Sequence, residues 1–207
     1  MKITLTDAGK RFNRDWIFRH LHYEFTAGRS YAITGANGSG KSTLLQAIAG
    51  AIGISEGNIS YDGVAPDQVF QHLSIAAPYL EVIDEMTAME FLRFHASFKP
   101  FLTGWTVQDI LQAVGLRTAA DKQIRYYSSG MRQRVRLAQA IFSDTELMLL
   151  DEPCTNLDVD GVALYRQLIA DHGRGRLVIV SSNDVQEYDF CEEIINIMAY
   201  KSVNGQK

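Results

Sequence analysis

The hydrophobic pattern changes along the chain, and each change predicts a different kind of secondary structure. The first third contains short runs of alternating or continuous apolar residues, which are typical of strands. We expect strands at Lys2–Leu5, Trp16–Phe25, Ser30–Thr34 and Asn58–Tyr61. From about Thr87 to Gln123, apolar residues recur every three or four positions, as they do along one face of a helix. The aromatic-rich stretch Phe98–Trp105 divides that region into two helices.

The second half of the chain returns to strands. Leu147–Leu150 and Leu177–Val180 are continuously apolar, which indicates strands buried on both faces of a parallel sheet. Helices are predicted at Ser129–Phe142 and about Val162–Ala170, and a last strand at Ile194–Tyr200. The order of strands and helices therefore predicts an α/β fold.

Length and composition indicate one ordinary globular unit. We expect a single domain over residues 1–207, with a helical insertion at about residues 79–130, because no linker rich in Pro, Gly or Ser divides the chain. The net charge of −4 and the pI near 5.7 argue against a nucleic-acid binder. Cys154 and Cys191 lack metal-ligand spacing, so we expect free thiols in a reducing cytosol. Met1–Asp7 lacks the apolar core of a signal peptide, and no apolar run approaches the roughly 20 residues of a membrane span.

A glycine-rich loop joins the strand Ser30–Thr34 to a helix expected at about Lys41–Ala51. The loop fits the pattern G-x-x-x-x-G-K-[ST], in which glycines let successive backbone N–H groups surround phosphates. Lys41 supplies a charge for the β- and γ-phosphates, and the Ser42 hydroxyl can coordinate Mg²⁺. We expect the phosphates of a nucleoside triphosphate to be bound by Gly35, Asn37, Gly38, Ser39, Gly40, Lys41, Ser42 and Thr43. Kinases, GTPases and motors share this loop, so it identifies the class of ligand but not the class of protein.

Two carboxylates, Asp151 and Glu152, directly follow the apolar strand Leu147–Leu150. An acidic pair at the end of such a strand carries an uncompensated charge unless a cation binds there. We expect Asp151 to bind Mg²⁺ together with Ser42, as a hard oxygen ligand. Glu152 is the candidate general base that polarises the attacking water, a role that contributes about 10²–10⁴-fold.

Three segments in a fixed order narrow the class of protein. Tyr126–Arg134, Leu147–Pro153 and Thr155–Asp158 resemble the signature motif, the Walker B strand and the D-loop of the ATP-binding cassette (ABC) family. The resemblance covers essentially the whole chain. It implies the ABC ATPase fold: a P-loop core with a mostly parallel sheet, an N-terminal antiparallel β-subdomain and a helical insertion. It also implies an ATPase that energises a transporter.

The resemblance also implies a dimer. Tyr127–Met131 stands where the family usually has Leu-Ser-Gly-Gly-Gln. Within it, Ser128, Ser129 and Gly130 would face the γ-phosphate of ATP bound by the opposite protomer. Two ATP molecules would then lie between head-to-tail copies, the second being this chain or a paralogous cassette. Asp158 would reach across the same interface. Phe12 stands where the family places an aromatic residue that stacks on adenine.

Trp16 and Phe18 are rivals of Phe12 for the stacking role, and any of the three could instead be a core residue.

Two further positions depart from the family pattern. Tyr79 occupies the Q-loop position of a glutamine, and Gln71 lies too early in the sequence to replace it. Asn183 occupies the position of the switch histidine. None of the histidines lies near that strand end in the sequence: His20, His22, His72, His95 and His172. Because Glu152 is retained, we expect hydrolysis that is slow but real.

A transmembrane permease subunit is the expected partner, docked at about Pro78–Ile83 and Phe91–Trp105, which would place the chain on the cytoplasmic face of a membrane. The aromatics Phe98, Phe101 and Trp105 would either form that groove or fill the core of the insertion. Two alternatives stay open: a soluble ABC-type ATPase unconnected with transport, and a weakly catalytic switch that uses ATP binding alone. The transported substrate and its direction are not encoded in this chain.

Overall fold

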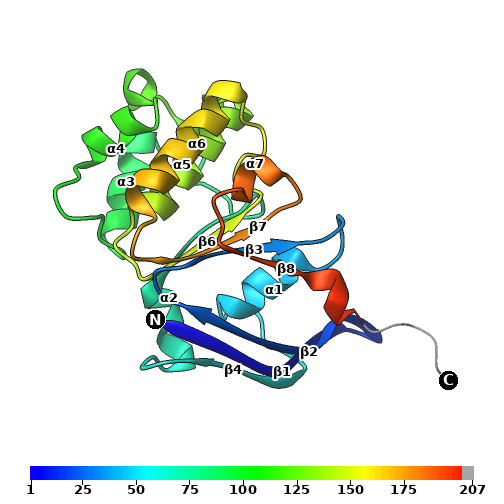
Figure 1. The fold of residues 1–207 in the computed structure, drawn as a ribbon. Helices are drawn as coiled ribbons and strands as arrows, with labels where there is room; N and C mark the ends of the chain where they lie inside the picture. Colours follow the sequence, from blue (N-terminus) through cyan, green and yellow to red (C-terminus); the bar gives the residue numbers. More distant parts are fainter. Residues whose placement is uncertain (202–207) are drawn as a thin grey trace.

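Two β-sheets with helices packed around them make up the computed structural model, which describes residues 1–201 (Figure 1). Five parallel strands form the larger sheet, in the order β5-β6-β7-β3-β8, and the antiparallel sheet has the order β2-β1-β4. The strands are β1 Lys2–Phe12, β2 Asp15–Thr26, β3 Ser30–Thr34, β4 Glu56–Tyr61, β5 Leu73–Ala76, β6 Leu147–Asp151, β7 Leu177–Ser181 and β8 Glu193–Asn196. The α-helices are α1 Lys41–Ile48, α2 Val69–His72, α3 Ala88–Ala96, α4 Val107–Ala113, α5 Ser129–Phe142, α6 Val159–His172 and α7 Val185–Tyr188. Short 3₁₀ turns occur at Pro66–Gln68, Arg117–Ala119, Ile124–Tyr126 and Ile197–Tyr200.

The parallel sheet is buried on both faces, as its continuous apolar strands predict. Met148 and Leu150 of β6 pack in one core with α3, α4, α5 and α6. Leu147 and Leu149 point to the opposite face and pack in a second core with α1 and the antiparallel sheet. Figure 1 shows these layers, with α1 between the two sheets. The period of two along a strand therefore divides one apolar run between two cores.

Capping residues set where the helices between β5 and α5 begin. Thr87 caps α3 and accepts a hydrogen bond from the Glu90 N–H, while the Glu90 carboxylate accepts one from the Thr87 N–H. Thr106 and Asp109 form the same reciprocal arrangement at the start of α4. Each pair satisfies two backbone donors that a helix start leaves free. These two capping pairs thus explain why the helices begin directly after Thr87 and Thr106.

The α/β fold class and most predicted elements are confirmed, with corrections at their ends. The strand predicted at Ile194–Tyr200 is wrong beyond Asn196, because the Asn196 side chain accepts a hydrogen bond from the Met198 N–H and starts a 3₁₀ turn. The helix α1 ends at Ile48 rather than near Ala51, since Gly50 adopts the left-handed conformation. Both cysteines are free, as expected, and within residues 1–201 no helix has the length and apolar character to cross a membrane.

The strand β1 is longer than predicted because it contains a β-bulge opposite Gly57. The pairing of β1 with β4 shifts register between Thr6 and Gly9, and the carbonyl of Asp7 turns toward Gly57. A Cβ at Gly57 would lie 2.1 Å from the Asp7 carbonyl oxygen. Both Gly57 and Gly63 have φ of +73°, but Gly63 has no atom within 4 Å of such a Cβ.

This pair of glycines gives a matched test of the bulge. We expect Gly63→Ala to lower the free energy of unfolding by about 1–2 kcal/mol, the cost of the left-handed backbone alone. Gly57→Ala adds a backbone collision and should cost at least about 3 kcal/mol. Urea unfolding of both variants followed by circular dichroism measures the difference. Equal losses for the two variants would contradict the bulge geometry.

Candidate functional site

The glycine-rich loop lies between β3 and α1, at the carboxyl edge of the parallel sheet. Lys41 is 5% exposed, and its Nζ donates hydrogen bonds to the carbonyl oxygens of Gly35 at 2.9 Å and Ala36 at 3.4 Å. A cavity of about 210 Å³ adjoins the loop. It is lined by Ile17, Asn37, Gly38, Ser39, Gly40, Lys41, Ser42, Thr43 and Glu152. Backbone N–H groups, an ammonium and a helix start therefore converge where an anion would bind.

Asp151 ends β6 with a buried carboxyl group. The residue is 1% exposed, and its Oδ1 makes no hydrogen bond within residues 1–201. Burial raises the pKa of the Asp151 carboxyl above its ordinary value, because the charged form loses its hydration. A cation beside this oxygen would offset that cost. The buried Ser39 Oγ near the loop also has no hydrogen-bond partner in the described part of the chain.

These side chains fit Mg²⁺ bound together with a nucleotide. Within residues 1–201, no group of three His, Cys, Asp or Glu side chains could hold a metal ion by itself. Mg²⁺ in phosphate-transfer sites takes one or two carboxylates and completes its shell with phosphate oxygens and water. Asp151 supplies one such carboxylate, and Ser42 supplies a hydroxyl at the wall of the phosphate cavity.

Glu152 has a backbone conformation that most residues avoid. Its φ is +44°, and its N–H donates to the Ser181 carbonyl oxygen at 2.8 Å, which joins the end of β6 to the end of β7. Its side chain lines the phosphate cavity and a second cavity of about 480 Å³, whose wall includes Asp158 and Asn183. Glu152 therefore lies between the phosphate loop and the segment that follows β7.

Asn183 lies directly beside the phosphate loop. Its Nδ2 donates a hydrogen bond to Asn37 Oδ1 at 2.7 Å, across 146 positions of sequence. The amide donor at the switch position is therefore within reach of a group bound in the loop. Both Asn37 and Asn183 line the second cavity.

Tyr79 follows β5 at the same edge of the sheet and is 44% exposed. Burial raises the pKa of the Tyr79 hydroxyl; the Gln46 side chain opposes this rise, and the Asp151 carboxylate adds to it. Gln71 is instead at the opposite edge, because its neighbour His72 pairs with Glu146 before the start of β6. Gln71 thus does not take the place of a Q-loop glutamine in space.

The predicted signature residues lie apart from both cavities. Ser128 is exposed and caps α5, and its Oγ accepts a hydrogen bond from the Met131 N–H at 3.2 Å. Gly130 packs on the D-loop, where a Cβ would lie 2.9 Å from the Asn156 carbonyl oxygen. Ser128, Ser129 and Gly130 line neither the phosphate cavity nor the second cavity. Within one copy they therefore form no part of the wall of the phosphate cavity.

Asp158 caps α6 within its own chain. Its Oδ1 accepts a hydrogen bond from the Gly161 N–H at 2.8 Å and lies 3.5 Å from Arg134 Nη2. The Asp158 side chain is nevertheless 74% exposed. It can therefore meet a second molecule while it keeps its capping bond.

The three aromatic candidates for adenine stacking differ in accessibility. Phe12 is 49% exposed near the β1–β2 turn, with Lys10 Nζ 4.9 Å from its ring centroid. Phe18 is fully buried in the core, which removes it as a platform. The Trp16 ring has the Arg19 guanidinium 4.5 Å from its centroid. Phe12 is the aromatic ring with the most open surface of the three.

Sequence reasoning missed two residues that shape the site. Ile17 lines the phosphate cavity, and a Cβ on Gly40 would lie 2.1 Å from Ile17 Cγ2, so this contact requires a glycine. Glu187 is 4% exposed, and its Oε1 accepts a hydrogen bond from the Cys154 N–H at 2.6 Å, which holds the turn after Glu152. Neither residue belongs to a motif, so no signal in the sequence could have found them.

Comparisons with known proteins agree with this geometry. The profile of the ABC transporter family matches residues 18–155. YybJ of Bacillus subtilis, an uncharacterized ABC transporter ATP-binding protein, is 28% identical over 192 residues, which cover 89% of this chain and 87% of that protein. The cytochrome c biogenesis ATP-binding export protein CcmA of Rhodopseudomonas palustris is 32% identical over 177 residues, with coverages of 81% and 84%. The dimeric structure of MJ0796, a bacterial ABC transporter cassette, matches with a TM-score of 0.81 at 21% identity over 94% of each chain.

The doubly covered parallel sheet and its phosphate loop define a nucleotide-binding ATPase fold of the ABC type. The chain belongs to the ABC transporter family, as an ATP-binding ATPase subunit. This confirms the family that the signature, Walker B and D-loop segments predict.

The buried carboxylate of Asp151, whose pKa is raised by burial, gives a test of the cation site. Asp151→Asn removes a buried charge, so it should raise the stability of the nucleotide-free protein by about 1 kcal/mol, or roughly 2–4 °C in melting temperature. The same variant should lose the stabilisation that wild-type protein gains from Mg²⁺-ATP. Thermal melts with and without Mg²⁺-ATP measure both effects, and the exposed Asp62→Asn is the control. Unchanged stabilisation by Mg²⁺-ATP in Asp151→Asn would contradict a role in binding Mg²⁺.

Proposed function

We propose that two copies of this chain close head to tail around two molecules of Mg²⁺-ATP, and that the hydrolysis which follows drives a transmembrane permease. The observation that carries the proposal is the separation of two half-sites. Lys41, Asp151, Glu152 and Asn183 gather at the carboxyl edge of the sheet, whereas the exposed cap at Ser128 lies away from both cavities. A second copy would bring its Ser128, Ser129 and Gly130 to the nucleotide.

The residues of one copy divide the work of phosphate binding. The backbone N–H groups of the loop and the Lys41 ammonium bind the phosphates, and Phe12 stacks on adenine. Ser42 and Asp151 would hold Mg²⁺, which when bound neutralises charge on the β- and γ-phosphates. Asn183, already oriented by its bond to Asn37, donates to the γ-phosphate.

Glu152 is the proposed general base. Its left-handed backbone and its N–H bond to Ser181 hold the residue at the wall of the phosphate cavity. From there its carboxylate accepts a proton from water as the water attacks the γ-phosphate. Asp158 of the second copy would contact the same nucleotide from the opposite side.

Hydrolysis is slow in this proposal because two positions depart from the family pattern. Tyr79 offers a hydroxyl near Asp151 but no amide oxygen to orient water or metal. Asn183 donates a hydrogen bond but cannot carry the positive charge of an imidazolium. The same two residues favour a second candidate function, a switch that uses ATP binding and dimer closure with little hydrolysis.

The permease would dock beside Tyr79, at Pro78–Ile83 and in the region Phe91–Trp105. Phe98 is 75% exposed and forms an edge-to-face pair with Phe94, with ring centroids 5.1 Å apart. Phe101 and Trp105 pack on the core instead, so the exposed pair is Phe94 with Phe98. Exposed aromatic side chains of this kind are typical anchors of protein interfaces.

This arrangement would place the chain on the cytoplasmic face of a membrane. We assign the whole of residues 1–207 to one cassette, with the helical segment at about residues 79–130 inserted between β5 and α5. A soluble ABC ATPase unconnected with transport is not favoured, because the relative from Rhodopseudomonas palustris is an ATP-binding export protein.

Trapping the nucleotide tests dimer closure. Glu152→Gln should release phosphate at least about 100-fold more slowly than wild-type protein. It should also form a stable dimer with Mg²⁺-ATP, because the nucleotide persists. Light scattering after size exclusion measures the dimer, and Lys41→Ala is the matched control that should bind no nucleotide and stay monomeric. A Glu152→Gln protein that binds ATP but stays monomeric would rule out head-to-tail closure, and an unchanged rate would remove Glu152 as the base.

Restoring the family residues tests the proposed cause of slow hydrolysis. The double variant Tyr79→Gln with Asn183→His should raise the rate of phosphate release about tenfold or more, while the affinity for ATP changes less than about threefold. The exposed Asn58→His is the control for a histidine introduced elsewhere. If the double variant is no faster than wild-type protein, Tyr79 and Asn183 do not limit the rate.

A further inference from the structure

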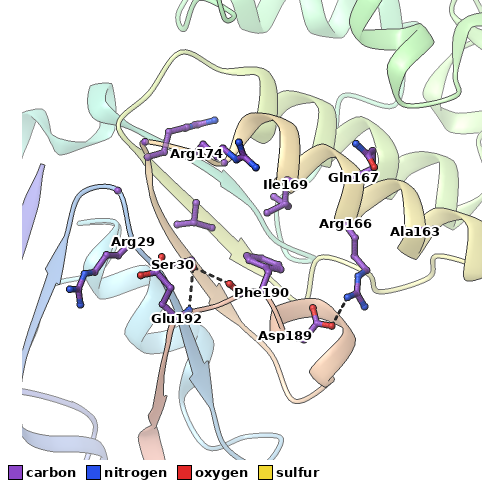
Figure 2. A pocket seen from close by; sticks show the side chains of 16 residues that line it. Arg29, Ser30, Ala163, Arg166, Gln167, Ile169, Arg174, Asp189, Phe190 and Glu192 are labelled. Carbon is purple, nitrogen blue, oxygen red and sulfur yellow. Dashed lines mark hydrogen bonds and ion pairs between the residues drawn. The ribbon is translucent and has the colours of Figure 1, made fainter.

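A cavity of about 720 Å³ lies at the edge of the parallel sheet opposite the phosphate loop. It is bounded by the turn before β3, the last turns of α6, the turn before β7 and the segment after α7 (Figure 2). None of the residues assigned to the nucleotide site lines it. A ligand here would not overlap a nucleotide bound at the phosphate loop.

The wall of this cavity carries an excess of positive charge. Its charged residues are Arg29, Arg166, Arg174, Arg176, Asp189 and Glu192. Arg166 forms an ion pair with Asp189, as Figure 2 shows, and Arg29 pairs with Glu193 outside the cavity. Arg174 and Arg176 form no ion pair within residues 1–201. The turn between α6 and β7 therefore presents one exposed guanidinium without a carboxylate partner, that of Arg174, while Arg176 lies buried beneath it.

Arg176 is the buried member of this pair and is 8% exposed. Its guanidinium donates to the Ile141 carbonyl oxygen at 2.8 Å and to the Thr145 hydroxyl at 2.6 Å, both uncharged acceptors. Its Nε has no hydrogen-bond partner in the described chain. Burial lowers the pKa of Arg176 to about 10. The Asp144 carboxylate offsets part of this cost, and an anion bound in the cavity would offset more of it.

The middle of the cavity is apolar. Ile169 and Val178 are 5% and 2% exposed, and both line it together with Phe190. In Figure 2, Ile169 and Phe190 lie between Arg174 at one end and the Arg166–Asp189 pair at the other. Asp189 and Glu192 would repel a ligand with several negative charges. The lining thus matches a molecule with one acidic group and an apolar body.

We propose that this cavity binds a small organic monoanion, with its acidic group toward Arg174 and its apolar body against Ile169 and Phe190. The volume lies within the range of about 300–1,000 Å³ that is usual for small-molecule sites. Because α6 joins the cavity to the D-loop residue Asp158, the ligand would contact a helix that also reaches the proposed dimer interface.

The fluorescent sulfonate 8-anilinonaphthalene-1-sulfonate is a suitable probe, since it carries one acidic group on an aromatic body. Titration of the full chain, in the presence of saturating Mg²⁺-ATP, should show saturable binding of one probe per chain. Arg174→Glu should weaken it at least tenfold, because the charge at the exposed turn is reversed. Ala170→Trp, on the exposed side of α6, should weaken it at least as much by filling the cavity.

Two control variants separate this site from other surfaces. Arg14→Glu reverses an exposed charge elsewhere, and Phe98→Ser removes the exposed aromatic pair, so neither should change the affinity for the probe. Retained ATP binding in Arg174→Glu and Ala170→Trp shows that both fold. Loss of probe binding in Phe98→Ser, or unchanged binding in both cavity variants, would overturn the proposal.

Competition identifies the apolar body of the ligand. Benzoate and octanoate carry the same acidic group on an aromatic and an aliphatic body, respectively. Displacement of the probe by either one supports the site and selects the body that fits. Displacement by neither at millimolar concentration would also overturn the proposal.

Discussion

The site depends on one electrostatic constraint, the buried charge at the end of β6. All five residues of β6 are buried, so the strand delivers the Asp151 carboxyl into the interior, where the Lys41 ammonium offsets only part of the cost of burial. The phosphate loop follows β3 and lies beside the end of β6. Its groups would bind phosphates, and those phosphates would also coordinate a divalent cation next to Asp151. The energetic cost of the buried Asp151 charge in the free protein would thus favour the proposed binding of a metal–nucleotide complex.

The helix α5 connects the predicted signature residues at its start to the segment that follows Tyr79. Its first residue follows the cap at Ser128, while Arg136 from its middle donates to the Leu80 carbonyl oxygen at 2.8 Å. Arg132 of the same helix pairs with Asp84 at 2.6 Å. The segment after Tyr79 is therefore fastened to the helix whose start would meet the opposite nucleotide. A partner that pushes on this segment would move the signature end directly.

The fold was largely predictable because its strongest signals are local. The apolar run Leu147–Leu150 favours a strand buried on both faces, and the glycine-rich loop between a strand and a helix favours a phosphate nest. The end of β8 was missed because a single side-chain bond from Asn196 outweighs the apolar residues that follow. Within the site, the contact between Ile17 and Gly40 and the bond from Cys154 to Glu187 join residues far apart in the sequence. Contacts of this kind depend on tertiary packing, so local sequence patterns do not predict them.

The hydrogen bond between Asn37 and Asn183 has a consequence for how the phosphate loop responds to a change in pH. An imidazole at the switch position would gain or lose a proton close to the pH of the cytosol, and its hydrogen-bonding role would change with it. An amide keeps the same donor and acceptor at every physiological acidity. This contact to the phosphate loop is therefore insensitive to acid stress, and a cell that acidifies would leave it intact.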